Sequence, residues 1–129
     1  VSNFIIQALT NKDITVYGDG KQTRSFCYVD DLINGIFLMM KKENLAGPVN
    51  LGNPSEISIY NLAQEIIDLT GSKSKIINKE LPVDDPKQRC PNIEIANKEL
   101  GWQPSFDREV GLKKTIEYFD ELLNKEKLK

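Results

Sequence analysis

Apolar residues recur three or four positions apart in five segments of the chain, the spacing that places side chains on one face of a helix. Each segment opens on or near a polar residue of the kind that caps a helix N-terminus. The helices are therefore expected to begin at Ser2, at Asp30 or Asp31, at Ser58, at Asn92 and near Asp107. Gly71 and Gly101 follow two of these segments and are suited to end a helix, because glycine readily adopts positive φ.

The second predicted helix is rich in apolar residues. Its apolar side chains are expected to face a core: Leu32, Ile33, Ile36, Phe37, Met39 and Met40. Lys41 and Lys42 suit its C-terminal end, where a helix dipole favours positive charge.

Shorter β-prone runs predict strands at residues 14–17, 25–29, 49–51 and 75–79. Helices and strands alternate, so the fold class is α/β, a mixed α+β fragment with short strands. A helix separates the last two strands, which predicts that they are parallel neighbours in a βαβ unit. Parallel strands normally lie inside a larger sheet that is covered on both faces. The chain is therefore expected to lack the rest of that sheet.

The overall composition bounds the class of protein. With 129 residues, 40% of them hydrophobic and 28% charged, the chain is expected to form a single soluble domain. A net charge of −2 provides no electrostatic footprint for nucleic acid. The longest apolar run, 36–40, is too short to cross a bilayer, and no signal peptide is recognisable. We therefore expect an intracellular, cytoplasmic protein without a membrane partner.

Histidine is absent from the chain. This excludes Ser-His, Cys-His and His-metal mechanisms, so any chemistry would come from Asp, Glu, Lys, Tyr or a cofactor. Cys27 and Cys90 lie far apart without a CxxC pair, so free thiols are favoured over a disulfide and no metal site is expected.

A glycine loop, YGDGKQTRSF from Tyr17, carries the first candidate binding residues. Gly18 and Gly20 permit positive φ and the close approach of a ligand, and Arg24 supplies a planar cation suited to phosphate oxygens. A plain β-hairpin with a surface arginine is the alternative. The loop is not a P-loop, because it lacks the Gly-Lys-Ser/Thr ending, and it is not a GxGxxG motif, because Thr23 stands where the third glycine would be.

The same loop contains a Tyr-x-x-x-Lys match between Tyr17 and Lys21. In short-chain dehydrogenases this pair requires a helix, and a Gly-Asp-Gly centre is a poor helix former, so we reject it.

A second arginine, Arg89, lies in the loop DDPKQRCPN, where two prolines restrict the backbone. Its alternative is a surface pair with Asp84 or Asp85. Two arginines in structured loops would suit a diphosphate. The acidic pairs at 30–31 and 84–85 are more simply a helix cap and a solvated turn than metal or acid/base carboxylates.

Five segments, in order along the chain, resemble one family. They are VSNFI at 1–5, YGDGKQTRSFCYVDDL, PVNLGNP at 48–54, DDPKQRCPNI and LGWQP at 100–104. Together they are similar to the C-terminal part of the extended short-chain dehydrogenase/reductase (NAD-dependent epimerase/dehydratase) family, specifically the UDP-glucuronate decarboxylases (UDP-xylose synthases). The resemblance covers essentially all 129 residues. Each motif alone is weak evidence for the resemblance, but five motifs in the same order are strong evidence for it.

The resemblance implies a two-part enzyme. An N-terminal Rossmann domain holds NAD and the catalytic residues, and a smaller C-terminal region binds the nucleotide sugar. NAD oxidises the sugar, the resulting β-keto acid loses CO₂, and the hydride returns to yield UDP-xylose. Residues 1–129 match only the second part, as one UDP-sugar-binding domain, so we expect no catalytic residue and no NAD site in this chain. The full-length enzyme is expected to be a homodimer, and the isolated chain could self-associate.

The resemblance also carries over binding residues position by position. Arg24 matches an arginine that contacts the nucleotide diphosphate, and Arg89 matches the arginine of an Arg-x-Pro-Asp loop that reaches the phosphate or ribose. Three further sites are expected to border the base pocket: Tyr17, Gln22 and the Asn3-Phe4 segment. Asn92 and Cys90 depart from the family pattern, which usually has Asp and often a basic residue there.

Two alternatives remain open at this point. One is the corresponding part of a dTDP-glucose 4,6-dehydratase or a UDP-hexose 4-epimerase. The other is a non-catalytic binding or self-association domain, because an apolar surface left bare by the missing half could drive association.

Overall fold

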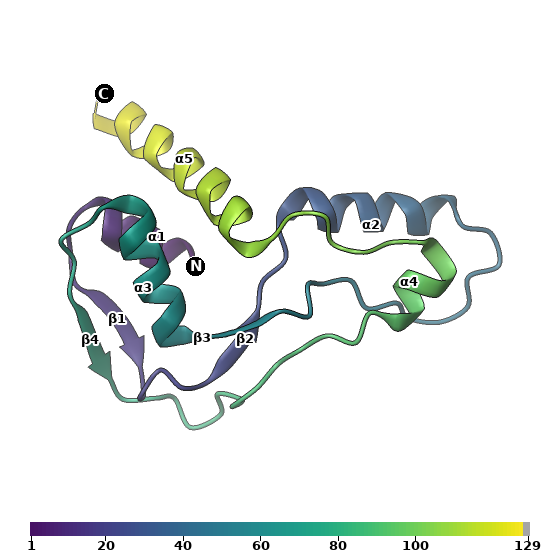
Figure 1. Cartoon of the computed structure of the whole chain (residues 1–129), viewed down its shortest axis with the longest axis horizontal. Helices are drawn as coiled ribbons and strands as arrows, with labels where there is room; N and C mark the ends of the chain where they lie inside the picture. The colour runs from purple at the N-terminus through teal and green to yellow at the C-terminus, as the bar shows by residue number, and fades with distance from the viewer. Residues whose placement is uncertain (128–129) are drawn as a thin grey trace.

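Five helices and four short strands follow one another in the computed structural model, which describes residues 1–127 (Figure 1). In chain order they are α1 (Ser2–Leu9), β1 (Ile14–Tyr17), β2 (Thr23–Ser25), α2 (Val29–Lys41), β3 (Glu56–Ser58), α3 (Ile59–Thr70), β4 (Ile76–Lys79), α4 (Glu94–Leu100) and α5 (Arg108–Lys127). The predicted α/β class with short strands is confirmed.

The strands form two separate pairs. β1 and β4 are parallel, with Ile14 opposite Ile76 and Tyr17 opposite Lys79. β2 and β3 are antiparallel. The prediction of a strand at residues 49–51 is therefore wrong, and β4 pairs with β1 instead. The alternative of a β-hairpin across the glycine loop is not observed, because β1 and β2 do not pair.

The main core lies at one end of the molecule, where α1 and α3 pack beside the β1–β4 pair (Figure 1). Its fully buried side chains include Ile5, Ile14, Val16, Leu62 and Ile66. Burying each one contributes roughly 1.5–3 kcal/mol of transfer free energy. This rigid end positions the residues of β1 and the loop that follows it.

Local signals set both ends of α3 as expected. The Ser58 hydroxyl accepts a hydrogen bond from the Asn61 amide at 3.2 Å, and α3 ends on Gly71 at φ 62°. The N-cap of α4 is Ile93 and not the predicted Asn92, whose Oδ1 accepts from the Glu94 amide at 2.9 Å. The prediction for Ser2 is wrong, because it lies inside α1 and makes no side-chain cap.

Asp31 has a different role from the predicted helix cap. Tyr28 is the N-cap of α2, and Asp31 is buried in the first turn, with 3% of its surface exposed. Its carboxylate accepts hydrogen bonds from the Ser105 amide (3.0 Å), the Ser105 hydroxyl (2.6 Å) and the Phe106 amide (2.9 Å). Burial acts to raise the pKa of Asp31, but these hydrogen bonds to the charged form outweigh it and lower the pKa. Asp31 therefore fastens α2 to the segment before α5.

The apolar residues of α2 do not all face a core, contrary to the prediction. Ile33, Ile36, Phe37 and Met40 are exposed. The covered side of α2 is instead the one that carries Asp31 and Gly35. There a Cβ on Gly35 would lie 2.8 Å from Leu51 and 3.1 Å from the Trp102 indole nitrogen. Helical spacing identified an apolar helix but could not show that only one of its sides is covered.

Candidate functional site

An open cleft of about 770 Å³ lies between α1, the ends of β1 and β4, β2, and the segment 80–86 that follows β4. Five of the six residues predicted to bind a nucleotide sugar line it: Asn3, Phe4, Tyr17, Gln22 and Arg24. Because these residues come from α1, β1, the glycine loop and β2, the fold brings distant parts of the sequence together here. This cleft is the candidate binding site.

The glycine loop supports α3 instead of offering its backbone to a ligand. Gly18 and Gly20 have φ of 69° and 73°, as their predicted role requires. However, the Gly20 carbonyl accepts from the Tyr60 amide at 3.1 Å, and the Gln22 carbonyl accepts from the Ile59 amide at 3.0 Å. The close neighbour of Gly20 is therefore the start of α3, and the loop satisfies first-turn amides that the helix itself cannot pair.

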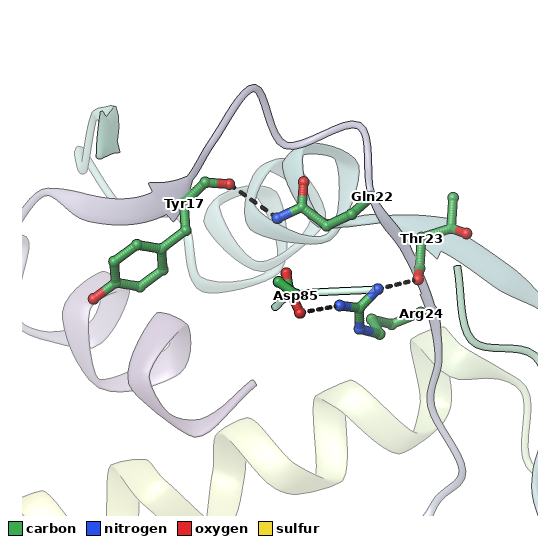
Figure 2. Close-up of polar contacts among 5 residues, drawn as sticks. All are labelled: Tyr17, Gln22, Thr23, Arg24 and Asp85. Atoms are coloured by element: carbon green, nitrogen blue, oxygen red, sulfur yellow. Dashed lines mark hydrogen bonds and ion pairs between the residues drawn. The ribbon is translucent and has the colours of Figure 1, made fainter. Parts of the chain in front are cut away.

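Gln22 braces the glycine loop from inside the cleft. Its side-chain amide donates to the Tyr17 carbonyl at 2.9 Å (Figure 2). This bond spans the two ends of the loop and leaves the side-chain carbonyl of Gln22 available to a ligand. The Tyr17 ring is half exposed and presents an aromatic face of the kind that packs against a nucleotide base.

Arg24 lies on β2, and its guanidinium points at Asp85 (Figure 2). Nη2 and Asp85 Oδ1 are 2.5 Å apart, and Nη1 donates to the Thr23 carbonyl at 2.7 Å. The side chains of Arg24 and Asp85 are 18% and 30% exposed. The cation expected to meet a diphosphate is thus positioned in the cleft and paired with an acid of the same chain.

The structure does not bring Arg89 into the cleft. Its side chain is exposed, and it is not among the residues that line the cavity. Its backbone nevertheless runs beside β2, because the Thr23 amide donates to the Lys87 carbonyl at 2.9 Å and Thr23 bridges Gln88. Arg89 therefore lies one residue beyond the bridge, alongside the strand that carries Arg24.

Sequence reasoning missed several lining residues, of which Lys79 is the most relevant chemically because it adds a second cation. Lys79 is opposite Tyr17 in the β1–β4 register. The signal that could have found it is the pairing of these strands, since the ends of parallel strands meet at one edge. Gln7 was missed as well; its side-chain oxygen accepts from the Thr15 amide at 3.3 Å.

Both cysteines are free thiols, as expected. Cys27 is half buried, and burial, together with the nearby charge of Asp31, raises the pKa of its thiol. A raised pKa disfavours the reactive thiolate, so Cys27 is not equipped as a nucleophile. In residues 1–127 there is no group of three His, Cys, Asp or Glu side chains placed to hold a metal ion. None of the helices in this described part is both long and apolar enough to cross a membrane.

Comparison of the sequence with known families and proteins shows its relationship. Residues 1–52 match the model of the NAD dependent epimerase/dehydratase family. The chain is 50% identical over 119 residues to UDP-glucuronic acid decarboxylase 1 of Xenopus tropicalis, covering 92% of this chain and 28% of that protein. It is 39% identical over 127 residues to UDP-glucuronic acid decarboxylase 1 of Arabidopsis thaliana, covering 98% of this chain and 29% of that protein. The chain thus spans less than a third of the length of these relatives.

Solved structures share the fold. UDP-glucose 4-epimerase of Thermotoga maritima, solved with UDP-glucose, superposes with a TM-score of 0.87 at 29% identity, over 93% of this chain and 38% of that one. UDP-glucuronic acid 4-epimerase of Bacillus cereus, solved with UDP-glucuronic acid and NAD, also gives 0.87, at 30% identity over 93% of this chain and 39% of that one.

The fold and the sequence matches indicate the class that this chain resembles: residues 1–52 match the NAD dependent epimerase/dehydratase family, and the fold is shared with two nucleotide-sugar epimerases. Its sequence is similar to the UDP-glucuronic acid decarboxylases, over nearly its whole length.

Proposed function

We propose that this chain is the C-terminal, nucleotide-sugar-binding part of a UDP-glucuronate decarboxylase, a lyase that makes UDP-xylose. One observation carries the binding role: Asn3, Phe4, Tyr17, Gln22 and Arg24 line the same cleft. In this proposal Arg24 and Lys79 meet the diphosphate, and Tyr17 packs against the base. Asn3, Phe4 and Gln22 border the pocket, and Arg89 approaches the phosphate or ribose from beside β2.

We propose further that NAD is held by the part of the enzyme outside this chain. A dinucleotide site of the usual kind needs free amides at a helix N-terminus that follows a glycine-rich turn. Here the first-turn amides of α3 are already bonded to the Gly20 and Gln22 carbonyls. The start of α3 therefore offers no free amides of this kind beside the glycine loop, and the chain alone is expected to be inactive.

The decarboxylase assignment is preferred to the alternatives from the family because the relatives named decarboxylases are 39–50% identical to this chain. The two epimerases described above are 29% and 30% identical to this chain, and a dTDP-glucose 4,6-dehydratase of Bacillus anthracis is 25% identical. Turnover of UDP-glucuronic acid by the full-length enzyme, with product identification, tests the choice. UDP-xylose with release of CO₂ is expected, whereas an epimer or a 4-keto-6-deoxy sugar would refute it.

Replacing Arg24 with alanine is expected to weaken UDP binding by about 1.5–3 kcal/mol, the usual contribution of hydrogen bonds to a charged group. The measurement is calorimetric titration of the chain with UDP, with UMP and inorganic phosphate as comparison ligands. A preference for UDP over UMP is expected if the cleft recognises a diphosphate.

The matched control is Lys21→Ala, which removes a cation from the same loop but from outside the cleft. Its affinity for UDP should remain close to that of the wild type. If Arg24→Ala binds UDP as well as Lys21→Ala does, Arg24 is not part of the site. An absence of UDP binding to the wild-type chain would contradict the proposed binding role for this chain alone.

The exposed apolar side of α2 favours a second role for the isolated chain, self-association. Val29, Ile33, Ile36, Phe37 and Met40 are all exposed. Since this chain spans only 28% of its Xenopus relative, we propose that the remainder of the enzyme covers this surface and that a second copy takes its place in isolation.

Ile33→Glu is therefore expected to shift the isolated chain from an associated to a monomeric species in sedimentation velocity. Ile33 is 57% exposed, so a charge there is compatible with the folded monomer. Tyr118→Glu, at an exposed aromatic on α5, is the control and should not change the distribution. A strictly monomeric, compact wild-type chain would contradict self-association.

A further inference from the structure

The Arg24–Asp85 ion pair places an acid of the chain at the position proposed for a ligand phosphate. Asp85 Oδ1 lies 2.5 Å from Arg24 Nη2, and both side chains are partly buried in the cleft (Figure 2). A phosphate oxygen and a carboxylate oxygen seek the same guanidinium N–H donors with the same geometry. A diphosphate that approaches Arg24 from the cleft therefore meets an acceptor already in place.

The charges that line the cleft balance one another. Arg24 and Lys79 contribute two positive charges, and Asp84 and Asp85 contribute two negative charges. A site for a multiply charged anion gains affinity from a net positive potential, which this arrangement does not supply. If Asp85 moved away from Arg24, the guanidinium would be free to bind an anion. The electrostatic potential beside Arg24 would then be positive.

The segment that carries Asp85 is fastened at its two ends. At one end, the Gly18 amide donates to the Lys79 carbonyl at 2.6 Å. At the other, the Gln88 side chain donates to the Glu56 carboxylate at 2.8 and 3.0 Å. Between them, residues 80–86 form an irregular turn, and Val83 is fully exposed. Among residues 1–127, Arg24 is the only recorded side-chain partner of the Asp85 carboxylate.

We propose that Asp85 is an internal counter-ion that occupies the anion site of Arg24 until a nucleoside diphosphate displaces it. This inference rests on the proposed UDP-sugar-binding function and adds a selective step to it. A ligand must supply enough negative charge and enough oxygen acceptors to replace the carboxylate. Diphosphates meet that requirement better than ligands with one phosphate group.

The test is Asp85→Asn, which removes the negative charge and retains the size of the side chain. Its affinity for UDP, measured by calorimetric titration at fixed ionic strength, is expected to rise about tenfold over that of the wild type, because charge-assisted pairing to Arg24 is lost. Asp84→Asn is the matched control, since it removes one charge from the same segment and the same cleft without touching the ion pair. It should raise affinity only about twofold.

The outcomes separate this proposal from the proposed function. If the wild type binds UDP but Asp85→Asn binds equally or more weakly, Asp85 orients Arg24 and the counter-ion role is overturned while the binding function stands. Equal gains for the two variants would also overturn it, because bulk charge would then explain both. If neither the wild type nor Asp85→Asn binds UDP, the proposed binding function fails and the counter-ion role fails with it.

Discussion

Replacing Asp31 with alanine is expected to lower the free energy of unfolding by about 3 kcal/mol, because a buried carboxylate that accepts several hydrogen bonds is removed. The substitution leaves the Ser105 amide, the Ser105 hydroxyl and the Phe106 amide without their acceptor. It also removes the side-chain link between α2 and the segment before α5, and leaves the bond from the Trp102 indole to the carbonyl of residue 31. Urea unfolding followed by circular dichroism measures the loss.

Asp30→Ala is the matched control, because Asp30 is the exposed neighbour of Asp31 in the same helical turn. It should cost only about 0.3–1 kcal/mol, the usual interaction of an acid with a helix N-terminus. Equal losses for the two variants would show that the hydrogen bonds of Asp31 contribute nothing beyond helix electrostatics.

The pH dependence of stability provides a second measurement on Asp31. Its pKa in the folded chain is lowered, so the carboxylate binds a proton less readily in the folded than in the unfolded state. The stabilisation is therefore fully present above the unfolded pKa of about 3.9 and is lost as the pH falls below it through the folded value. Asp31→Asn should lose stability at neutral pH and show a shallower decline in acid than the wild type. An identical acid profile for the two proteins would contradict this role.

Helix positions could be predicted from the sequence because their signals are local. Ser58 and Gly71 mark the two ends of α3 within the helix itself, and the structure places both in those roles. The strand partners could not be predicted in the same way. β1 pairs with β4 across 62 positions between Ile14 and Ile76, and no residue near either strand specifies that partner. The expected pairing of residues 49–51 with β4 followed from chain order, which does not determine strand neighbours.

The candidate site could also be predicted only in part from the sequence. The resemblance to the family identified Arg24 and Tyr17, and the structure places both at one cleft. The alternative interpretation of Arg89, a surface pair with Asp84 or Asp85, followed from their proximity in sequence. In the structure Asp85 pairs with Arg24, 61 positions away. The closeness of two charged residues in the sequence does not predict which residues form an ion pair when a loop folds back onto a distant strand.

Gly20→Ala is expected to lower the free energy of unfolding by about 3 kcal/mol, from strain in the left-handed region and from overpacking together. Gly20 has φ 73°, and an added Cβ would lie 2.9 Å from Tyr60 Cβ and 3.0 Å from Val16 Cγ1. Both neighbours are fixed, since Val16 is in the core and the Tyr60 amide is bonded to the Gly20 carbonyl. The loop cannot move away without releasing the first turn of α3.

Gly71→Ala separates the two causes of that loss. Gly71 has φ 62°, and in residues 1–127 no atom apart from those of its chain neighbours lies within 4 Å of an added Cβ, so this variant reports backbone strain alone, about 1 kcal/mol. Urea unfolding of both variants gives the contribution of crowding at Gly20 as the difference. If Gly20→Ala and Gly71→Ala lowered the free energy of unfolding equally, the crowding at Gly20 would contribute nothing. The loop could then move away from α3 with little loss of stability. The glycine would then be needed only for its φ, and the loop would not brace the cleft residues Tyr17 and Gln22 against the core.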